Sequence, residues 1–413
     1  MPVRYTAATD ADLLPVDGIL LGTARGRIKA WDRDDVVLIV ADRGTVAGGV
    51  FTQNRFAAAP VQVSRRHLAE QAARGIDFRG LAINAGNANA GTGATGLANA
   101  HATCVKVAQM LDCAPEEVLV YSTGVIMEPL PVERVVDALP AAKAAARRDG
   151  WLAAARGIMT TDTVHKAASR RIDVDGQPVT VSGMAKGAGM IHPDMATMLA
   201  FAATDAPLDR ALLGSLAREV ADVSFNGATV DGDTSTNDSF VLAATHRARI
   251  APIVRTDDPR YALVRGAIEA VAVELAQAIV RDGEGATKFI AIAVERGRDV
   301  DECRRVGFAI AHSPLVKTAF SASDPNLGRI VCAIGYGAAP DLDPDRVSFW
   351  LDDVAVVLHG GRAPTYREED GQRVMKQDEI TVRVDLGRGA ARATVWTCDL
   401  THEYVTINAE YRS

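Results

Sequence analysis

The chain has 413 residues, of which 48% are apolar and 23% are charged, and it carries a formal net charge of −7. These proportions exclude a disordered, collagen-like or coiled-coil chain, and the scattered basic residues give no electrostatic footprint for nucleic acid. The sequence has no apolar run near the ~18 residues of a membrane span and no signal-peptide pattern, so we expect a cytoplasmic protein without a membrane partner. The five cysteines include no C-x-x-C pair, so we expect neither a disulfide framework nor a zinc site.

Strand-like and helix-like segments are mixed along the whole chain. Short apolar runs near turn residues predict strands over residues 35–41, 80–85, 118–121, 240–245, 289–294, 353–358, 380–384 and 393–397. Helical spacing of apolar residues predicts helices over residues 97–111, 211–223, 261–280 and 300–312. This mixture predicts an α/β or α+β core. The most polar stretch, residues 362–379, is expected to form a surface loop or a hairpin.

Gly91, Gly93 and Gly96 satisfy the pattern G-x-G-x-x-G ahead of an expected helix. Dinucleotide binding needs the first glycine directly after a strand and an acidic residue at the end of the next strand, about 20 residues on. Here residues 87–90 intervene after the strand, and Asp112 falls at the end of the helix. We therefore expect no bound dinucleotide.

Thr123 and Gly124 follow an expected strand at residues 117–120. A threonine hydroxyl beside an unobstructed glycine N–H offers two donors to a developing oxyanion, a contribution often of about 10²–10³ in rate. A simple turn at the end of a strand explains the same two residues. From spacing alone, both interpretations stay open.

Residues 186–199 begin with Lys186 and deliver Thr197 at the start of an apolar run. A threonine hydroxyl is a weak nucleophile that needs an adjacent base, and its own α-amine can serve once the chain is cut before it. The hydroxyl of Thr197 would first attack the Ala196 carbonyl, in a loop where Gly187 and Pro193 favour close approach of the backbone. A glycine-rich turn entering a buried strand is the simpler local interpretation.

The polar loop at residues 230–239 resembles a calcium loop only in part. Asp231, Asp233 and Ser235 occupy positions 1, 3 and 5 of an EF-hand pattern. Position 6 is Thr236 rather than glycine, and position 12 is Leu242 rather than glutamate. We expect a tight, internally hydrogen-bonded loop at the border of a site, without a metal.

Two charged residues could recognise an amino acid, which carries one charge of each sign. Glu284 lies between two glycines, where its carboxylate could reach an ammonium group, and Lys186 could pair with a carboxylate. Taken singly, both also fit solvated loop charges. His192 has no G-x-S-x-G partner motif, so we expect a surface or supporting histidine rather than a catalytic one.

Together these segments resemble the ornithine acetyltransferase family, the glutamate N-acetyltransferases of arginine biosynthesis. The resemblance runs from end to end of the chain. Its motifs are VFTQNRF (50–56), NAGNANA (84–90), STGVI (122–126), MTTDT (159–163), KGAGMIHPDMATML (186–199), VDGDTSTND (230–238), DGEGATK (282–288), HSPLVKTA (312–319) and NAEYRS (408–413).

The resemblance implies a layered α/β/β/α fold related to the self-cleaving aminopeptidases. It also implies a precursor that cuts itself between Ala196 and Thr197, giving an α chain of residues 1–196 and a β chain of residues 197–413 that stay together as an α2β2 heterotetramer. The family moves an acetyl group from N²-acetylornithine to glutamate through an acetyl-threonine. It needs no metal or cofactor, and some members also make N-acetylglutamate from acetyl-CoA.

Site residues follow from the resemblance by motif. Thr197 looks like the nucleophile, with Thr123 and Gly124 as oxyanion donors. The implied substrate contacts are Thr160, Lys186, Thr197, Glu284, Asn408 and Ser413, where Thr160 rather than Thr161 rests on spacing alone. The chain departs from the family at Ser413, where threonine is also common, and at Gly91, where many relatives have cysteine. Two alternatives remain, an aminopeptidase or amidohydrolase with the same threonine nucleophile and a non-catalytic relative that senses ligand.

Overall fold

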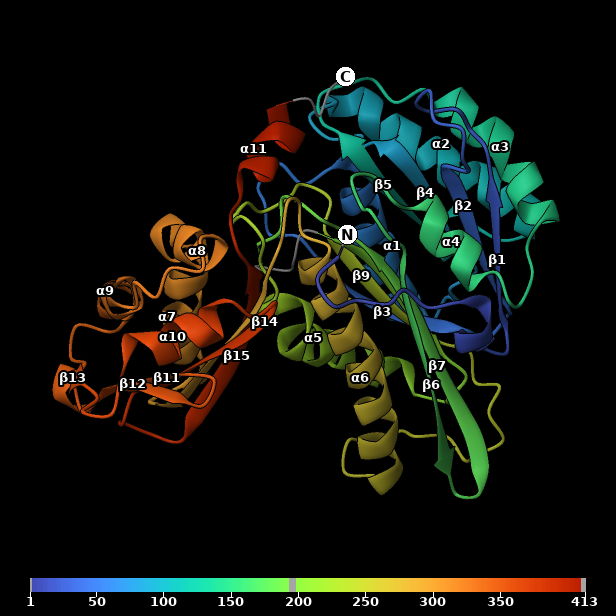
Figure 1. Cartoon of the computed structure of the whole chain (residues 1–413). Coiled ribbons are helices and arrows are strands. Elements are labelled where there is room, and N and C mark those ends of the chain that lie inside the picture. Colours follow the sequence, from blue (N-terminus) through green and yellow to red (C-terminus); the bar gives the residue numbers. More distant parts are fainter. Residues whose placement is uncertain (1, 193–197, 410–413) are drawn as a thin grey trace. The chain divides into compact units, whose positions relative to one another are not determined.

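The computed structural model describes residues 2–192 and 198–409, and the chain divides into two units (Figure 1). The larger unit comprises Thr6–Asn226 and Asp233–Ile279. The smaller unit comprises Met1–Tyr5, Gly227–Gly232 and Val280–Ser413. The predicted cut between residues 196 and 197 lies outside the described residues, and its place in the sequence falls within the larger unit.

The larger unit contains two sheets. The first has four strands in the order β1 (Ile19–Ala24), β2 (Val36–Ala41), β4 (Gly80–Asn87) and β5 (Val118–Val125). The second has five strands in the order β3 (Val46–Phe51), β9 (Ser239–Ala244), β8 (Leu199–Thr204), β7 (Gln177–Lys186) and β6 (Lys166–Val174). Pairing is antiparallel except for β4 with β5 and β8 with β9, which are parallel.

The two sheets pack face to face because alternate strand residues point to opposite faces. In β2, Val37 and Ile39 enter a core that also contains Phe201 of β8 and Val241 of β9. The intervening Leu38 belongs to a second core on the outer face of the first sheet. A strand that is apolar at every position is therefore buried on both sides.

Helices cover the outer faces of both sheets (Figure 1). The second core joins the first sheet to α2 (Gly93–Leu111) and α3 (Val132–Ala144). On the other side, α5 (Arg210–Val223) packs against β3, and α6 (Pro259–Arg281) packs against β7 at Gly183. Residues of α1 (Ala59–Arg74) and α4 (Trp151–Gly157) also belong to the core between the two sheets. The predicted α/β/β/α layering is confirmed in this unit.

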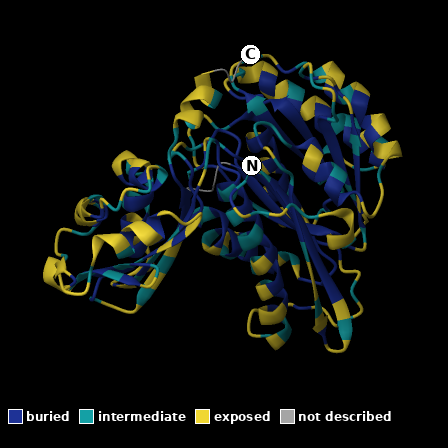
Figure 2. Cartoon of the chain, in the orientation of Figure 1, coloured by how far each residue is buried: buried dark blue, intermediate teal, exposed yellow. Residues whose placement is uncertain are grey.

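The smaller unit is built on one mixed sheet and its helices. The strand order is β13 (Gly361–Arg362), β12 (Val354–Leu358), β11 (Ser348–Leu351), β14 (Glu379–Asp385), β10 (Phe289–Gly297) and β15 (Ala391–Cys398). Its core is shared with α7 (Val300–His312), α8 (Pro314–Ser321), α9 (Gly328–Gly337) and α10 (Glu368–Met375). The chain continues after β15 into α11 (His402–Ala409). In both units the strands are mainly buried and the exposed residues gather on helices and loops (Figure 2).

Every strand and helix predicted from apolar patterning is present, with ends shifted by a few residues. The prediction for residues 362–379 is wrong in part, because α10 lies inside this stretch. Glu368, Glu369 and Asp370 occupy its first turn, where acidic side chains favour a helix, and Val374 and Met375 are buried. With only two buried apolar side chains, the helix could not be recognised from periodicity.

The chain also contains short 3-10 turns at Asp10–Asp12, Pro115–Glu117, Phe225–Gly227 and Pro344–Arg346. Across residues 2–192 and 198–409, no helix combines the length and apolar character needed to cross a bilayer.

Candidate active site

The predicted cleavage loop connects two neighbouring strands. β7 ends at Lys186 and β8 begins at Leu199, and these two residues are paired across the antiparallel ladder. On the other side of β8, the Ser239 N–H donates to the Met198 carbonyl at 3.0 Å. The start of β8 is therefore fixed from both sides. Ala196 and Thr197 themselves lie outside the described residues, so their predicted roles stay predictions.

The predicted oxyanion donors lie inside β5, not in a turn after it. Gly124 is paired with Gly86 of β4 and has φ +132°, in the region that favours glycine. A Cβ added at Gly124 would lie 2.2 Å from the carbonyl carbon of Gly86. No other residue fits here without moving the neighbouring strand.

The side chains of Thr123 and Lys186 meet at the ends of β5 and β7. The Lys186 ammonium donates to Thr123 Oγ1 at 3.3 Å, and Thr123 is buried. Because a lysine ammonium can only donate, Oγ1 acts as the acceptor in this contact and its own hydrogen is left for another acceptor. The predicted oxyanion donor and a predicted substrate contact thus belong to one cluster.

Asp162 joins two of the motifs singled out in the sequence. Its Oδ1 accepts from the Gly187 N–H at 2.7 Å, and its Oδ2 accepts from the Thr160 N–H at 3.0 Å. Oδ1 also forms an ion pair of 2.7 Å with Lys166, and neither side chain is exposed. Thr160 is therefore tied to the residue that follows Lys186.

The electrostatic environment keeps Asp162 ionised. Burial alone would raise its pKa, but the charges of Lys166 and Lys186, with hydrogen bonds from Lys166 and Thr160, hold the pKa of this carboxyl well below its usual range. A permanently charged carboxylate is a stable acceptor for the two backbone N–H groups. Sequence reasoning missed the role of Lys166, although a lysine beside the apolar pair Ala167-Ala168 is a recognisable signal.

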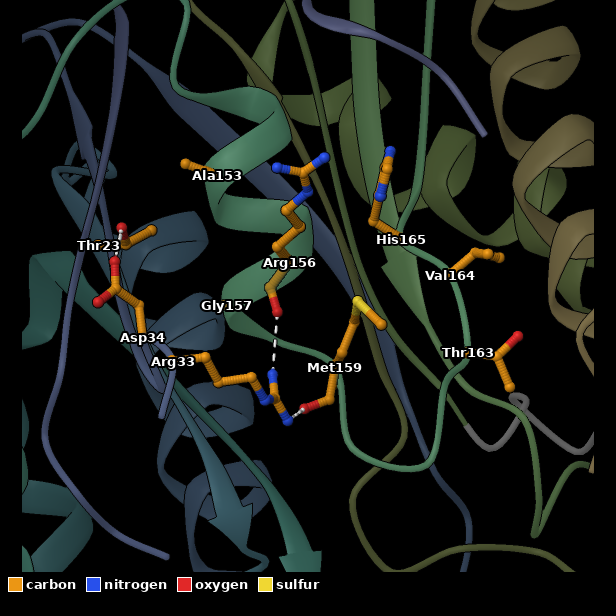
Figure 3. A pocket seen from close by; sticks show the side chains of 10 residues that line it. All are labelled: Thr23, Arg33, Asp34, Ala153, Arg156, Gly157, Met159, Thr163, Val164 and His165. Atoms are coloured by element: carbon orange, nitrogen blue, oxygen red, sulfur yellow. Dashed lines mark hydrogen bonds between the residues drawn. The ribbon is translucent and has the colours of Figure 1, made fainter. Parts of the chain in front are cut away.

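A pocket of about 510 Å³ lies beside the segment that carries Thr160 (Figure 3). Arg33 donates to the carbonyls of Arg156 at 3.0 Å and Met159 at 2.6 Å, which fixes the chain directly before Thr160. Among the residues that the structure describes, none of those predicted as site residues lines this pocket. Thr160 and Thr161 are both half-buried, so burial does not distinguish them as the substrate contact.

The polar loop before β9 is internally hydrogen-bonded, as predicted. The Asn237 N–H donates to Ser235 Oγ at 3.1 Å, and Thr236 Oγ1 donates to Asn237 Oδ1 at 2.6 Å. The Asn237 amide also donates to the carbonyls of Ala88 and Ser122, at 2.6 and 2.8 Å. The loop is thereby attached to β5 one residue before Thr123.

In the smaller unit, Glu284 and Asn408 are brought together. Asn408 Nδ2 donates to Glu284 Oε2 at 2.7 Å, and Glu284 is buried. Gly285, with φ +71°, lets α11 approach closely, since a Cβ there would lie 2.6 Å from the Tyr404 nitrogen. The rest of this loop is held by Asp399, which accepts from the Thr287 and Lys288 N–H groups. Ser413 lies outside the described residues.

The structure also places two other features of the sequence, Asp112 and His192. Asp112 ends α2 in the left-handed region rather than ending a strand. The glycine pattern at residues 91–96, which runs into the first turn of α2, therefore lacks the acidic residue that dinucleotide binding requires. His192 is half-buried. Its role stays a prediction.

A family model, the ArgJ family, matches residues 21–413. This match covers nearly the whole chain. The chain belongs to the ArgJ family. The resemblance identified in the sequence is thereby confirmed, and the chain is an N-acetyltransferase of arginine biosynthesis.

Solved structures include relatives of this ArgJ chain. The arginine biosynthesis bifunctional protein argJ from Bacillus halodurans is 34% identical, with coverage of 51% of this chain and 97% of that chain and a TM-score of 0.48. An ornithine acetyltransferase from Mycobacterium tuberculosis, complexed with ornithine, is 32% identical, with coverages of 45% and 94% and a TM-score of 0.38. An L-aminopeptidase D-Ala-esterase/amidase from Ochrobactrum anthropi is 15% identical, with coverages of 68% and 90% and a TM-score of 0.40.

Proposed function

We propose that this ArgJ protein transfers an acetyl group from N²-acetylornithine to glutamate through an acetyl ester on Thr197. The observation that carries the proposal is the cluster of Thr123, Gly124 and Lys186 at the ends of β5 and β7. Its hydroxyl and its glycine N–H are the donors that an acyl-transfer site needs. Both lie on β5, and Lys186, which contacts the hydroxyl, ends the strand that precedes the segment with Thr197 in the sequence.

The mechanism begins with self-cleavage. The hydroxyl of Thr197 attacks the Ala196 carbonyl, and hydrolysis of the resulting ester frees the Thr197 α-amine. This amine has a reference pKa of about 7.7–8.0, which suits it to accept and return protons near neutral pH. The N-terminal threonine then has its own base, as a weak hydroxyl nucleophile requires.

Acetyl transfer between two amines is close to isoenergetic, so the protein need only lower the barrier and keep water away from the ester. The hydroxyl of Thr123 and the N–H of Gly124 would stabilise the negative oxygen of each tetrahedral intermediate. The covalent acetyl-threonine splits the reaction into two steps and predicts ping-pong kinetics.

Recognition must serve two substrates that share an α-amino-acid frame but differ in side-chain charge. We assign the carboxylate of Glu284, with Asn408 as its hydrogen-bond partner, to the positive groups of the substrates. Lys186 would meet the negative groups, with Thr160 and Ser413 as further contacts. Several of these assignments lie on loops that the structure fixes with buried carboxylates, Asp162 in one unit and Asp399 in the other.

The decisive test is mass analysis of the purified protein. The uncut chain has a mass of 43.7 kDa, and cleavage predicts two pieces of about half that mass, one starting at Thr197. An intact chain would contradict the first step and favour a non-catalytic, ligand-sensing protein.

Native mass measurement tests the further proposal of an α2β2 assembly, and cell fractionation tests a cytoplasmic location.

A second assay separates transfer from hydrolysis. N²-acetylornithine is supplied with and without glutamate, and transfer requires N-acetylglutamate to appear in step with ornithine. Ornithine release that does not depend on glutamate would favour the aminopeptidase-type hydrolase. Replacing N²-acetylornithine by acetyl-CoA tests whether the protein also has the second activity found in some members of the family.

A further inference from the structure

Asp238 is a buried carboxyl group at the start of the central strands of the second sheet. It directly precedes β9, and the residue is only 1% exposed. The proposed mechanism gives it no role. The Thr52 N–H donates to its carbonyl at 2.9 Å, and the next residue, Ser239, donates its N–H to Met198. Backbone hydrogen bonds on both sides therefore hold Asp238 beside the first described residue after the cleavage loop.

The strand order places Asp238 and Lys186 on opposite sides of the start of β8. β8 lies between β9 and β7, with Leu199 paired to Ser239 on one side and to Lys186 on the other. Lys186 also reaches Thr123 of the oxyanion cluster. Asp238 thus borders the cluster that carries the proposed acyl transfer.

One oxygen of this carboxyl group, Oδ2, is buried and accepts no hydrogen bond from the residues that the structure describes. A buried polar atom without a partner is unfavourable, so each one calls for an explanation, such as a catalytic role.

The environment favours the protonated form. Burial raises the pKa of Asp238 well above its usual range, against the opposing effects of the Met198 N–H, the positive charge of Lys186 and hydrogen bonds from Ser235. Lys186, on β7, is the charged group that acts on it. A carboxyl group with a raised pKa can give a proton and take it back closer to neutral pH than an ordinary carboxyl group.

We propose that Asp238 is a further acid–base residue of the acetyl-transfer site, beside Thr123 and Lys186. This inference rests on the proposed function, in which the Thr197 α-amine removes the proton of the attacking hydroxyl. The departing nitrogen also needs a proton, which either the resulting Thr197 ammonium or a second acid beside the site can supply. Asp238 supplies it.

The proton balance closes over the two half-reactions. In the first, Thr197 Oγ1 bonds to the acetyl carbon, the C–N bond of N²-acetylornithine breaks, and the proton of Asp238 passes to the leaving nitrogen. In the second, the nitrogen of glutamate bonds to the acetyl carbon, its proton passes to the Asp238 carboxylate, and the C–Oγ1 bond breaks as the Thr197 ammonium returns a proton to Oγ1. The enzyme ends in its starting state.

The test compares Asp238→Asn with Asp205→Asn. Asparagine keeps the shape and the acceptor oxygen of the side chain but cannot exchange the proton. Asp205 is a matched control at the other end of β8: it is buried, burial also raises its pKa, and its Oδ1 accepts from the Thr180 N–H at 2.8 Å. Cleavage is followed on newly made precursor, and kcat and KM are normalised to the cleaved fraction measured by mass.

We expect D238N to slow cleavage and lower kcat by about 10²–10⁴-fold, with KM for both substrates changed less than about threefold. The alkaline fall of kcat/KM in the wild-type pH profile should disappear in D238N, because only the protonated carboxyl donates. D205N should match the wild type in all three measurements. Melting temperatures separate a folding defect from a chemical one.

D238N with wild-type rates and an unchanged pH profile would overturn the inference. If D238N does not fold, the wild-type profile decides, since a kcat/KM that shows no alkaline fall would exclude a carboxylic acid donor. These outcomes differ from failure of the proposed function, in which the wild-type protein itself would stay uncut or transfer no acetyl group.

Discussion

The Asp162 carboxylate and the Lys166 ammonium lie 2.7 Å apart, and neither side chain is accessible to solvent. The same carboxylate accepts the N–H groups of Thr160 and Gly187. A single buried charge therefore orders two segments that the sequence assigns to substrate binding. We therefore expect stability and substrate recognition to be coupled at this point.

Asp162→Asn removes the charge but keeps the size of the side chain. It leaves the Lys166 ammonium buried without a counterion, a change that costs about 3–5 kcal/mol of unfolding free energy. Chemical denaturation measures the loss. Asp353→Asn is the control, because it breaks an exposed ion pair with Arg373 and should cost at most about 1 kcal/mol. Equal losses in the two variants would show that the buried pair contributes no more than a surface pair.

Acid should remove the stabilisation by Asp162. Its pKa in the folded protein is lowered, so the native state holds this proton less tightly than the unfolded chain, where the pKa is about 3.9. The contribution is fully present above that value and is lost as the pH falls toward the lower folded pKa. The unfolding free energy of the wild type minus that of D162N should be constant above about pH 5 and should shrink below about pH 4. A difference that grows with acid would reverse the assigned sign.

The sequence predicted the strands and helices that carry strong apolar patterns, and the family resemblance predicted their layering. It could not predict that Thr123 and Gly124 belong to β5, because the left-handed backbone of Gly124 depends on the close approach of Gly86 on the neighbouring strand. Such a contact is tertiary and leaves no local trace.

The buried carboxylates of the site were also outside sequence reasoning. Asp162 and Asp238 both stand in motifs that the sequence singled out, yet only the fold shows that one is paired with Lys166 and that the other has an oxygen without a hydrogen-bond partner among the described residues. Their pKa shifts have opposite directions, because burial dominates at Asp238 whereas the charges of Lys166 and Lys186 outweigh burial at Asp162. Residue type alone gives the same expectation for both.

Gly124→Ala tests the oxyanion donor. The added Cβ would meet the Gly86 carbonyl carbon at 2.2 Å and would also be strained at φ +132°, so the strand must shift. We expect a loss of about 10²–10³ in kcat, the usual effect of losing one oxyanion donor. Gly214→Ala, in α5 with open space around its Cβ position, is the control and should keep wild-type activity. A G124A protein with unchanged kcat would exclude this N–H from the reaction.

Glu284→Gln tests amino-acid recognition. Glutamine can still accept the hydrogen bond from Asn408, so the local structure should persist while the negative charge is lost. Because a hydrogen bond to a charged group contributes about 1.5–3 kcal/mol, KM for both substrates should rise about 10–100-fold. Glu403→Gln, at an exposed position on α11, is the control and should leave both values unchanged. Unchanged KM values in E284Q would refute the assignment.

The two products of cleavage should stay bound to each other without a covalent link. In the second sheet, β3, β6 and β7 come from residues 1–196, whereas β8 and β9 come from residues 197–413. The order β3-β9-β8-β7-β6 places β9 and β8 of the second product between strands of the first. β8 pairs with β7 from Val181↔Thr204 to Lys186↔Leu199, and β9 pairs with β3 from Val46↔Ala244 to Phe51↔Ser239.

Separating the products would therefore open two ladders and expose the core between the sheets. We expect the cleaved chains to co-elute in size-exclusion chromatography up to the denaturant concentration of global unfolding, in one cooperative transition. Thr197→Ala, which cannot cut itself, is the matched uncut control and should elute at the same volume. At a fixed oligomeric state, the unfolding of T197A should not depend on protein concentration. The cleaved wild type should become more stable as concentration rises, because unfolding of the cleaved protein also dissociates the two products. Release of free residues 1–196 in native buffer would show that these ladders do not hold the products together.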